Sequence, residues 1–116
     1  MRSLNFPFYK QQEQKDCGPT SLRIIAKYYN KTIPLQQLRK LCETTRGGSS
    51  MMGLSDAAEA IGFRTIGVKL NFNDFKKDAP LPCVVHWNKN HFAVVYKIKK
   101  DQVYISDPAI GLLQYS

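Results

Sequence analysis

Apolar residues recur at helical spacing in the first part of the chain. After Asp16 and Pro19, such residues follow at positions i, i+3, i+4 and i+7, namely Leu22, Ile25, Ala26 and Tyr29. Asp16 is a suitable N-cap, and Pro19 in the first turn lacks only an N–H that the helix does not need. The pattern therefore predicts a helix that begins beside Asp16 and buries one apolar face.

Two more helices are predicted before residue 63. One begins at Pro34 and places Leu35, Leu38, Leu41 and Cys42 on one face. The other is short and carries Leu54, Ala57, Ala58 and Ile61. Gly62 is suited to the position just past its end, where a left-handed backbone is common. Residues 44–48 are predicted to form the loop between these two helices.

The second half of the chain has the pattern of β-strands. Strands are predicted at residues 63–70, 83–87, 91–98 and 102–106, and residues 112–116 also have a strand-like sequence. The segment 91–98 is the strongest of these, because it is rich in β-branched and aromatic residues. Residues 73–77 are predicted to form a helical turn. Helices followed by antiparallel strands indicate an α+β fold.

Composition adds limits to this picture. The chain has 116 residues, 43% apolar and 22% charged, which suits one globular domain. No apolar run approaches the roughly 20 residues that cross a bilayer. The formal charge is +8, but the basic residues are scattered rather than clustered. A nucleic-acid-binding module is therefore disfavoured, and a solvated basic surface is the simpler interpretation.

The three cysteines differ in their sequence surroundings. Their odd number argues against a disulfide framework, and neither a CxxC motif nor zinc-like histidine spacing occurs. We therefore expect no metal and no cofactor. Cys42 and Cys83 lie among apolar residues and are predicted to be core residues. Cys17 instead lies at a helix start, where unpaired N–H groups and the helix dipole favour a thiolate. Gly18 beside it would leave room for a substrate backbone.

A catalytic role for Cys17 requires a base and a group that orients the base. His91 begins the strongest strand, and Asp107 ends the strand that returns to it. A turn centred on Lys99 would set these two residues opposite each other, and a slip of one or two positions would still leave them close. His86, the competing histidine, has no acidic residue in an evident partner position.

A peptidase also needs donors that stabilise an oxyanion. Gln11, six positions before Cys17, could supply a side-chain amide together with the backbone N–H of Cys17. Gln12 and Gln14 have the same chemistry. The residue types alone leave this choice open.

Five stretches resemble the C39 peptidases, the N-terminal peptidase domains of bacterial bacteriocin and peptide-pheromone ABC exporters. They are QQEQKDCGPTSL at 11–22, MGLSDAAEAIGF at 52–63, LPCVVHW at 81–87, NHFAVV at 90–95 and ISDPAIG at 105–111. The resemblance covers nearly the whole chain in the family's order. It implies a papain-like fold, with N-terminal helices packed on a C-terminal antiparallel sheet.

The resemblance also implies roles for individual residues. Cys17 would be the nucleophile, His91 the base, Asp107 the group that orients it, and Gln11 the oxyanion donor. Within the same stretches, Met52, Trp87 and Asn90 are expected to contact substrate. The implied reaction is cleavage of a leader peptide after a Gly-Gly pair.

The implied setting is a membrane exporter. We expect residues 1–116 to form a single peptidase domain excised from a longer ABC exporter, or else a stand-alone relative. The expected partners are a leader peptide and the exporter's membrane and ATPase domains, at the cytoplasmic side of the bacterial membrane. The alternative is a non-catalytic peptide-docking domain, which lacks the cysteine in some relatives. The joint presence of Cys17, His91, Asp107 and Gln11 favours the enzyme.

Overall fold

The computed structural model describes residues 6–44, 47–69, 71–87 and 91–116, with only the backbone of residue 87. A short 3-10 helix, η2, leads directly into the first α-helix. The elements are η2 (Gln14–Asp16), α1 (Cys17–Tyr28), α2 (Leu35–Leu41), α3 (Met51–Ala60), α4 (Phe72–Asp78), β1 (Cys83–Trp87), β2 (His91–Lys99), β3 (Gln102–Asp107) and β4 (Gly111–Tyr115). No helix in these described ranges is long and apolar enough to cross a bilayer.

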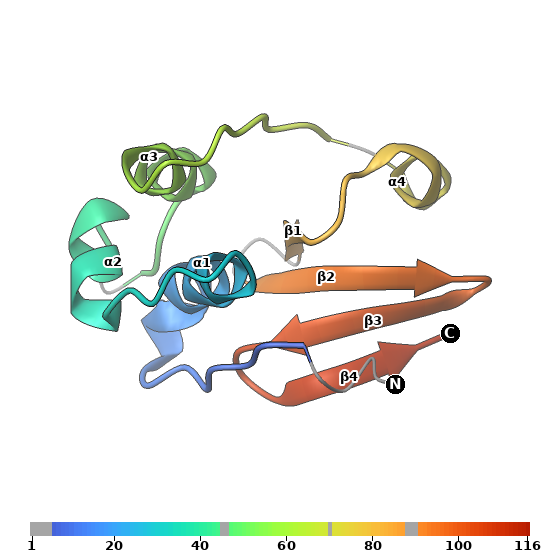
Figure 1. Ribbon diagram of the computed structural model, residues 1–116, viewed down its shortest axis with the longest axis horizontal. Helices are drawn as coiled ribbons and strands as arrows, with labels where there is room; N and C mark the ends of the chain where they lie inside the picture. Colours follow the sequence, from blue (N-terminus) through green and yellow to red (C-terminus); the bar gives the residue numbers. More distant parts are fainter. Residues whose placement is uncertain (1–5, 45–46, 70, 88–90) are drawn as a thin grey trace.

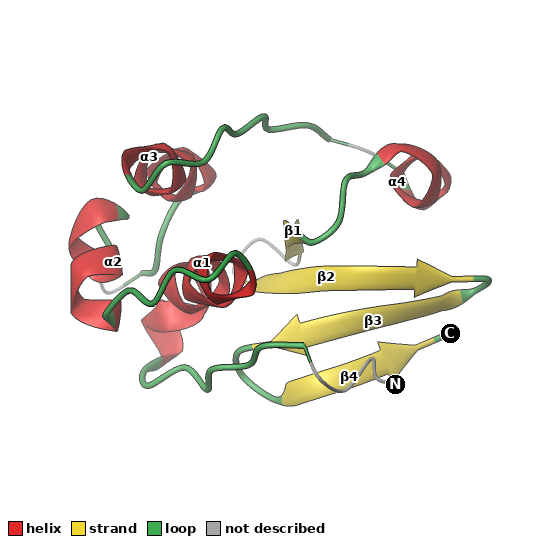
Figure 2. Cartoon of the chain, viewed as in Figure 1, coloured by secondary structure: helices red, strands yellow, loops and turns green. Residues whose placement is uncertain are grey.

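The four strands form one antiparallel sheet in the order β1-β2-β3-β4. Helix α1 lies against β2, whereas α2 and α3 pack beyond it on the side away from the strands (Figure 1). Colouring by secondary structure shows the helical part beside the sheet (Figure 2). This arrangement confirms the predicted α+β class, with the helices first in sequence and the sheet last.

The central strand β2 contributes side chains to the core on both faces of the sheet. Phe92 packs in a cluster with α1, α2 and α3, and Val94 packs with Ile24 and Ile25 of α1. Ala93 belongs to a separate cluster, which Phe75 of α4, among others, packs against. The alternation follows from the two-residue period of a strand. It fixes β2, and with it His91, between two packed layers.

The strand predicted at 63–70 is wrong for its described part, because residues 63–69 form an extended connection without a strand partner. A strand is stable only when its N–H and C=O groups pair with a neighbour. Ile66 is 83% exposed and Val68 61%, so neither side chain supports packing on a core. The connection runs from α3 towards α4 along the outside of the molecule (Figure 1). Residue 70 lies outside the described residues.

The start of α1 is confirmed, but Asp16 does not act as its cap. Its carboxylate makes no cap hydrogen bond within α1 and instead binds Arg39 of α2 and the Glu13 N–H. Helix η2 runs into α1 without a break. The first turn of α1 is therefore preceded by a helical turn and not by a loop. At the end of α3, Gly62 has the expected positive φ, +103°.

The β2–β3 hairpin is confirmed with a shifted register. Ser106 lies opposite Val94, two positions from the predicted alignment of Asp107 with His91. A bulge between Val95 and Lys97 changes the register within the hairpin. The sequence pattern could not show this extra residue. The shift is within the one or two positions that the sequence allowed, and the two side chains still meet.

Candidate active site

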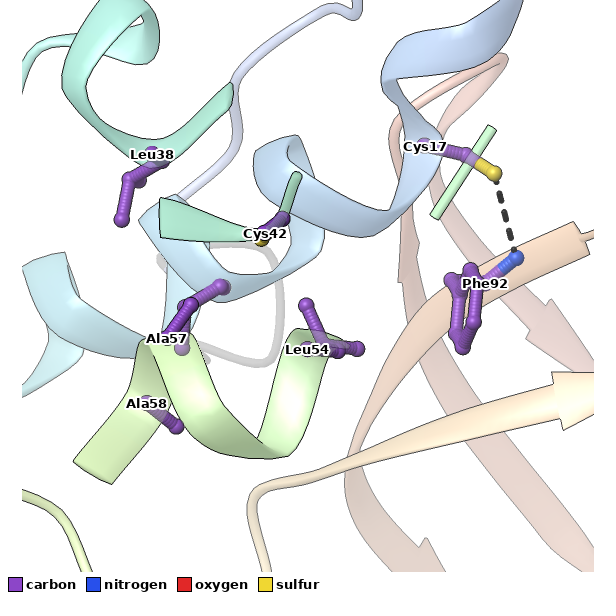
Figure 3. Packing of buried hydrophobic residues seen from close by; sticks show 8 residues of the cluster. Cys17, Leu38, Cys42, Leu54, Ala57, Ala58 and Phe92 are labelled. Atoms are coloured by element: carbon purple, nitrogen blue, oxygen red, sulfur yellow. Dashed lines mark hydrogen bonds between the residues drawn. The ribbon is translucent and has the colours of Figure 1, made fainter. Parts of the chain in front are cut away.

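Cys17 is the first residue of α1, and its thiol points at the start of β2. Its Sγ accepts a hydrogen bond from the backbone N–H of Phe92 at 3.4 Å (Figure 3). The residue is only 6% exposed. Phe92 directly follows His91, so the thiol lies beside the backbone of the predicted base.

Two opposing effects act on the Cys17 thiol. Burial is the largest and raises its pKa above the ordinary value, and the nearby Asp107 carboxylate raises it further. The backbone N–H groups of Phe92, Gly18 and Cys17 itself lower it, as the position at a helix start predicts. Burial outweighs these donors. The backbone donors that the sequence predicted are therefore present. The net pKa of the thiol is nevertheless raised, so the predicted preference for a thiolate is wrong.

His91 and Asp107 form the predicted pair. His91 Nε2 lies 2.9 Å from Oδ1 and 3.0 Å from Oδ2 of Asp107. The carboxylate is buried, and the Ala109 backbone N–H donates to its Oδ1 at 2.9 Å. These bonds hold the carboxylate in place, and the carboxylate fixes the imidazole ring. The other ring nitrogen, Nδ1, is directed away from Asp107.

Gln11 is held next to this pair by the backbone. Its N–H donates to the carbonyl of Pro108, the residue after Asp107, at 2.9 Å. Its side-chain Nε2 donates to the Glu13 carbonyl at 3.1 Å, and its Oε1 is buried without a hydrogen-bond partner. In contrast, Gln12 and Gln14 are exposed. Of the three glutamines, Gln11 is the one tied to the strand end that carries Asp107.

The competing residues have other surroundings. His86 lies on β1, and its ring stacks on Phe92 with centroids 4.1 Å apart. Cys42 and Cys83 pack in core clusters, as predicted, and burial raises the pKa of each to about 11. Gly18 is packed more tightly than expected, since a Cβ there would come within 3.1 Å of Ser49 Cβ. A side chain at this position would therefore crowd Ser49 and Phe92, and room for a substrate backbone beside Gly18 stays a prediction.

Of the three predicted substrate contacts, the structure describes the side chain of Met52 alone. Met52 is 75% exposed on α3. It lines a cavity of about 270 Å³ with Cys42, Glu43, Gly48, Ser50, Gly53 and Asp56. Asn90 and the Trp87 side chain lie outside the described residues. Sequence reasoning also missed the Phe92 N–H, because a backbone donor leaves no signal in the residue type.

A thiol at a helix start, bound to the backbone next to a histidine that is hydrogen-bonded to a buried carboxylate, fits the arrangement of a cysteine peptidase. Sequence comparison assigns this class to a family. The sequence model of the Peptidase C39 family matches residues 5–116, and the chain belongs to that family.

Curated relatives are much longer than this chain. The lactococcin-G-processing and transport ATP-binding protein LagD of Lactococcus lactis is 37% identical over 109 residues, which cover 90% of this chain and 16% of LagD. The transport/processing ATP-binding protein ComA of Streptococcus pneumoniae is 37% identical over 107 residues, 88% of this chain and 15% of ComA. The chain thus spans about a sixth of the length of these relatives.

Solved structures share the fold. A double glycine motif protease from an AMS/PCAT transporter, in complex with its leader peptide, superposes with a TM-score of 0.92 at 36% identity, covering 97% of this chain and 80% of that one. The peptidase domain of Streptococcus ComA gives a TM-score of 0.84 at 28% identity, covering 97% and 87%. These matches confirm the papain-like peptidase fold that the sequence predicted.

Proposed function

We propose that this chain is a cysteine endopeptidase that removes a double-glycine leader from a secreted peptide precursor, with Cys17 as nucleophile. The observation that carries the proposal is the His91–Asp107 pair, at 2.9 and 3.0 Å, at the strand start where the Phe92 N–H meets the Cys17 thiol. The substrate class is supported by the relatives, which are bacteriocin transport/processing proteins and a double glycine motif protease.

The proposed reaction follows the roles of these groups. Cys17 Sγ attacks the carbonyl carbon of the second glycine, and His91 accepts the thiol proton. The oxyanion is stabilised by the Cys17 backbone N–H and by Gln11 Nε2, whose second hydrogen is not needed by Glu13. The C–N bond then breaks, and His91 returns the proton to the leaving amine. Water, deprotonated by His91, hydrolyses the thioester and releases the leader and the free thiol.

The raised pKa of Cys17 bears on the first step. A raised pKa favours the protonated thiol, so attack is aided by proton transfer to His91. Asp107 keeps the ring aligned and stabilises the imidazolium that forms. The Asp107 charge disfavours a thiolate that stands alone but favours the thiolate–imidazolium pair. Base-assisted attack is therefore the step that this site supports.

The names and lengths of the relatives support a cellular setting for this domain. Since LagD and ComA are transport and processing proteins of which this chain covers about a sixth, we propose that residues 1–116 act as the peptidase domain of an ABC exporter. Its membrane and ATPase domains would then be partners. The leader would be cut on the cytoplasmic side, where the precursor is made. Cleavage would be coupled to export in the same protein.

The test is cleavage of a double-glycine precursor by the purified domain, followed by mass spectrometry. We expect a single cut after Gly-Gly, and no cut by Cys17→Ala. Cys42→Ala is the matched control: it removes another buried thiol, one that packs in the core, and it should retain cleavage. Normal cleavage by Cys17→Ala would overturn the mechanism. Binding of the precursor without any cleavage by the unmodified domain would instead support the peptide-docking alternative.

A further inference from the structure

An ion pair joins the start of α1 to α2 immediately before the nucleophile. The Asp16 side chain is fully buried, and Arg39 is 18% exposed. Arg39 Nε donates to Asp16 Oδ1 at 2.8 Å, and Arg39 Nη2 donates to Oδ2 at 2.6 Å. The pairing is bidentate and therefore fixes the plane as well as the position of the carboxylate.

The same carboxylate holds the segment that leads to Gln11. Asp16 Oδ2 also accepts the Glu13 backbone N–H at 3.0 Å. The Glu13 carbonyl, in turn, accepts Gln11 Nε2 at 3.1 Å, and Arg39 Nη2 lies 3.4 Å from Glu13 Oε2. Hydrogen bonds thus run from the guanidinium through Asp16 to the Glu13 backbone and on to the Gln11 amide.

Burial of this ion pair is poorly explained by stability alone. Burial would raise the pKa of Asp16, yet the Arg39 guanidinium and the Glu13 N–H outweigh it and hold that pKa below its ordinary value. The group is therefore a buried carboxylate that stays charged. Apolar residues of similar volume usually replace such pairs without loss of stability, whereas a role in fixing a geometry can retain them. Here the geometry that is fixed is that of the Glu13 backbone, whose N–H donates to the Asp16 carboxylate and whose carbonyl accepts the Asp16 N–H at 3.0 Å.

We propose that Arg39 is a positioning residue for the oxyanion donor, and that it acts on the Gln11 amide through Asp16 and Glu13. The inference rests on the proposed function, because it assigns Gln11 to the oxyanion. Donors of an oxyanion hole must lie within a narrow distance of the developing charge, and small displacements cost large factors in rate. The bidentate pair fixes the Asp16 carboxylate, which holds the Glu13 N–H, and the adjoining Glu13 carbonyl holds the Gln11 amide with that accuracy.

The test is a double-mutant cycle of Arg39→Lys and Gln11→Ala, read as kcat and KM on a double-glycine precursor. Lysine keeps the charge beside Asp16 but cannot reproduce two parallel hydrogen bonds. We expect Gln11→Ala to lower kcat by roughly a hundredfold. Arg39→Lys should lower kcat by about threefold to tenfold with KM changed less than about twofold. The double variant should match Gln11→Ala alone, because Arg39 has no amide left to position.

The controls separate this role from a structural one. Leu35→Ala removes a buried side chain from the same helix, and it should lower the unfolding midpoint while leaving kcat unchanged. A kcat loss in Arg39→Lys that multiplies with that of Gln11→Ala, or an equal kcat loss in Leu35→Ala, would overturn the inference. An unchanged kcat in Arg39→Lys would also overturn it while leaving the proposed function intact. An unchanged kcat in Gln11→Ala would remove the oxyanion assignment itself.

Discussion

The chemistry of the proposed nucleophile is decided within one turn of helix and one strand end. The Cys17 thiol has backbone N–H donors around it, but its burial raises the pKa more than they lower it. A thiol in this state needs a base to become reactive. His91 is suited to that role because Asp107, held by the Ala109 N–H, fixes one side of its ring. After the nucleophile itself, the histidine is therefore the residue on which turnover should depend most strongly.

Replacing each histidine in turn tests this dependence. His91→Ala should lower kcat by about 10²- to 10⁴-fold, the usual contribution of a general base. His86→Ala loses a ring stacked on Phe92 and should cost about 0.5–1.5 kcal/mol of stability, with kcat changed only a few-fold. Steady-state kinetics and urea unfolding of both variants measure the two effects. The opposite ranking of the two kcat values would show that the base has been misassigned.

The helices and strands differ in how far they could be predicted. Helices α1, α2 and α3 and strands β1, β2 and β3 were predicted, because each buries one face or lies between two layers. The segment 63–69 was predicted wrongly, since its β-branched residues Thr65, Ile66 and Val68 are typical of a strand although no strand pairs with it. Whether a segment pairs with another strand depends on the tertiary fold, and the local sequence pattern does not show it.

The candidate site shows the same limit. Cys17, His91 and Asp107 were predicted as site residues because their residue types carry chemistry and the hairpin brings two of them together. The Phe92 N–H and the Asp16–Arg39 pair were missed, because a backbone donor has no residue signature and Arg39 lies 23 positions from Asp16. The local pattern predicted an N-cap role for Asp16. The structure replaces it with a tertiary one.

The contact between α2 and α3 depends on a glycine. A Cβ on Gly53 would lie 2.6 Å from the Cys42 carbonyl oxygen at the end of α2. Replacing a glycine inside a helix by alanine normally raises the free energy of unfolding by about 1 kcal/mol. At Gly53 we expect the opposite effect, because the added Cβ would meet this oxygen. We expect Gly53→Ala to lower the free energy of unfolding by about 1–3 kcal/mol, the range for overpacking.

A second glycine provides the matched control for Gly53. Gly67 has no atom within 4 Å of the place where a Cβ would be, and its φ is outside the left-handed region. Gly67→Ala should therefore change the free energy of unfolding by less than about 0.5 kcal/mol. Chemical denaturation of both variants measures the difference. Equal stability of the two would show that α3 can move away from α2 without cost.

For the whole molecule, the buried thiols predict how stability changes in alkaline solution. Cys42 and Cys83 have pKa values of about 11, against 9.0 for an ordinary thiol. Because the folded pKa is the higher one, their contribution to stability is fully present below pH 9 and is lost as the pH rises through 11. For Cys42, which is 1% exposed, the loss approaches ~1.4 kcal/mol per pH unit.

A cysteine variant isolates this effect from the titration of lysines and tyrosines. Cys42→Ala should be less stable than the unmodified protein at pH 8, because a buried side chain is shortened. Its free energy of unfolding should nevertheless fall less steeply between pH 9 and pH 11, since one buried thiol no longer needs to ionise. Urea titrations at several pH values measure both slopes. If the free energy of unfolding fell equally steeply with pH in both proteins, the Cys42 thiol would ionise as easily in the folded state as in the unfolded one, and its pKa would not be raised.

Recognition of the precursor should also involve more of the molecule than the cleavage site. A pocket that accepts only glycine rejects larger side chains by steric exclusion, but two glycines offer little area for binding. If the proposed function holds, an amphipathic leader helix could supply that area through its apolar face, a mode in which affinity comes from apolar anchors. The net charge of +8 would in addition speed the capture of an acidic leader.

These considerations predict how kcat/KM responds to leader length and to salt. A short peptide that contains only the Gly-Gly site should be cleaved far less efficiently than a full leader. Removing the leader's apolar residues should weaken binding more than removing its acidic ones, because exposed charges are screened and contribute little to affinity. Raising the salt concentration should slow capture moderately without abolishing cleavage. The measurement is kcat/KM for this substrate series at two ionic strengths, with a leader of scrambled sequence and equal charge as the control. If the short peptide matched the full leader, recognition would be confined to the cleavage site, and the basic surface would have no part in it.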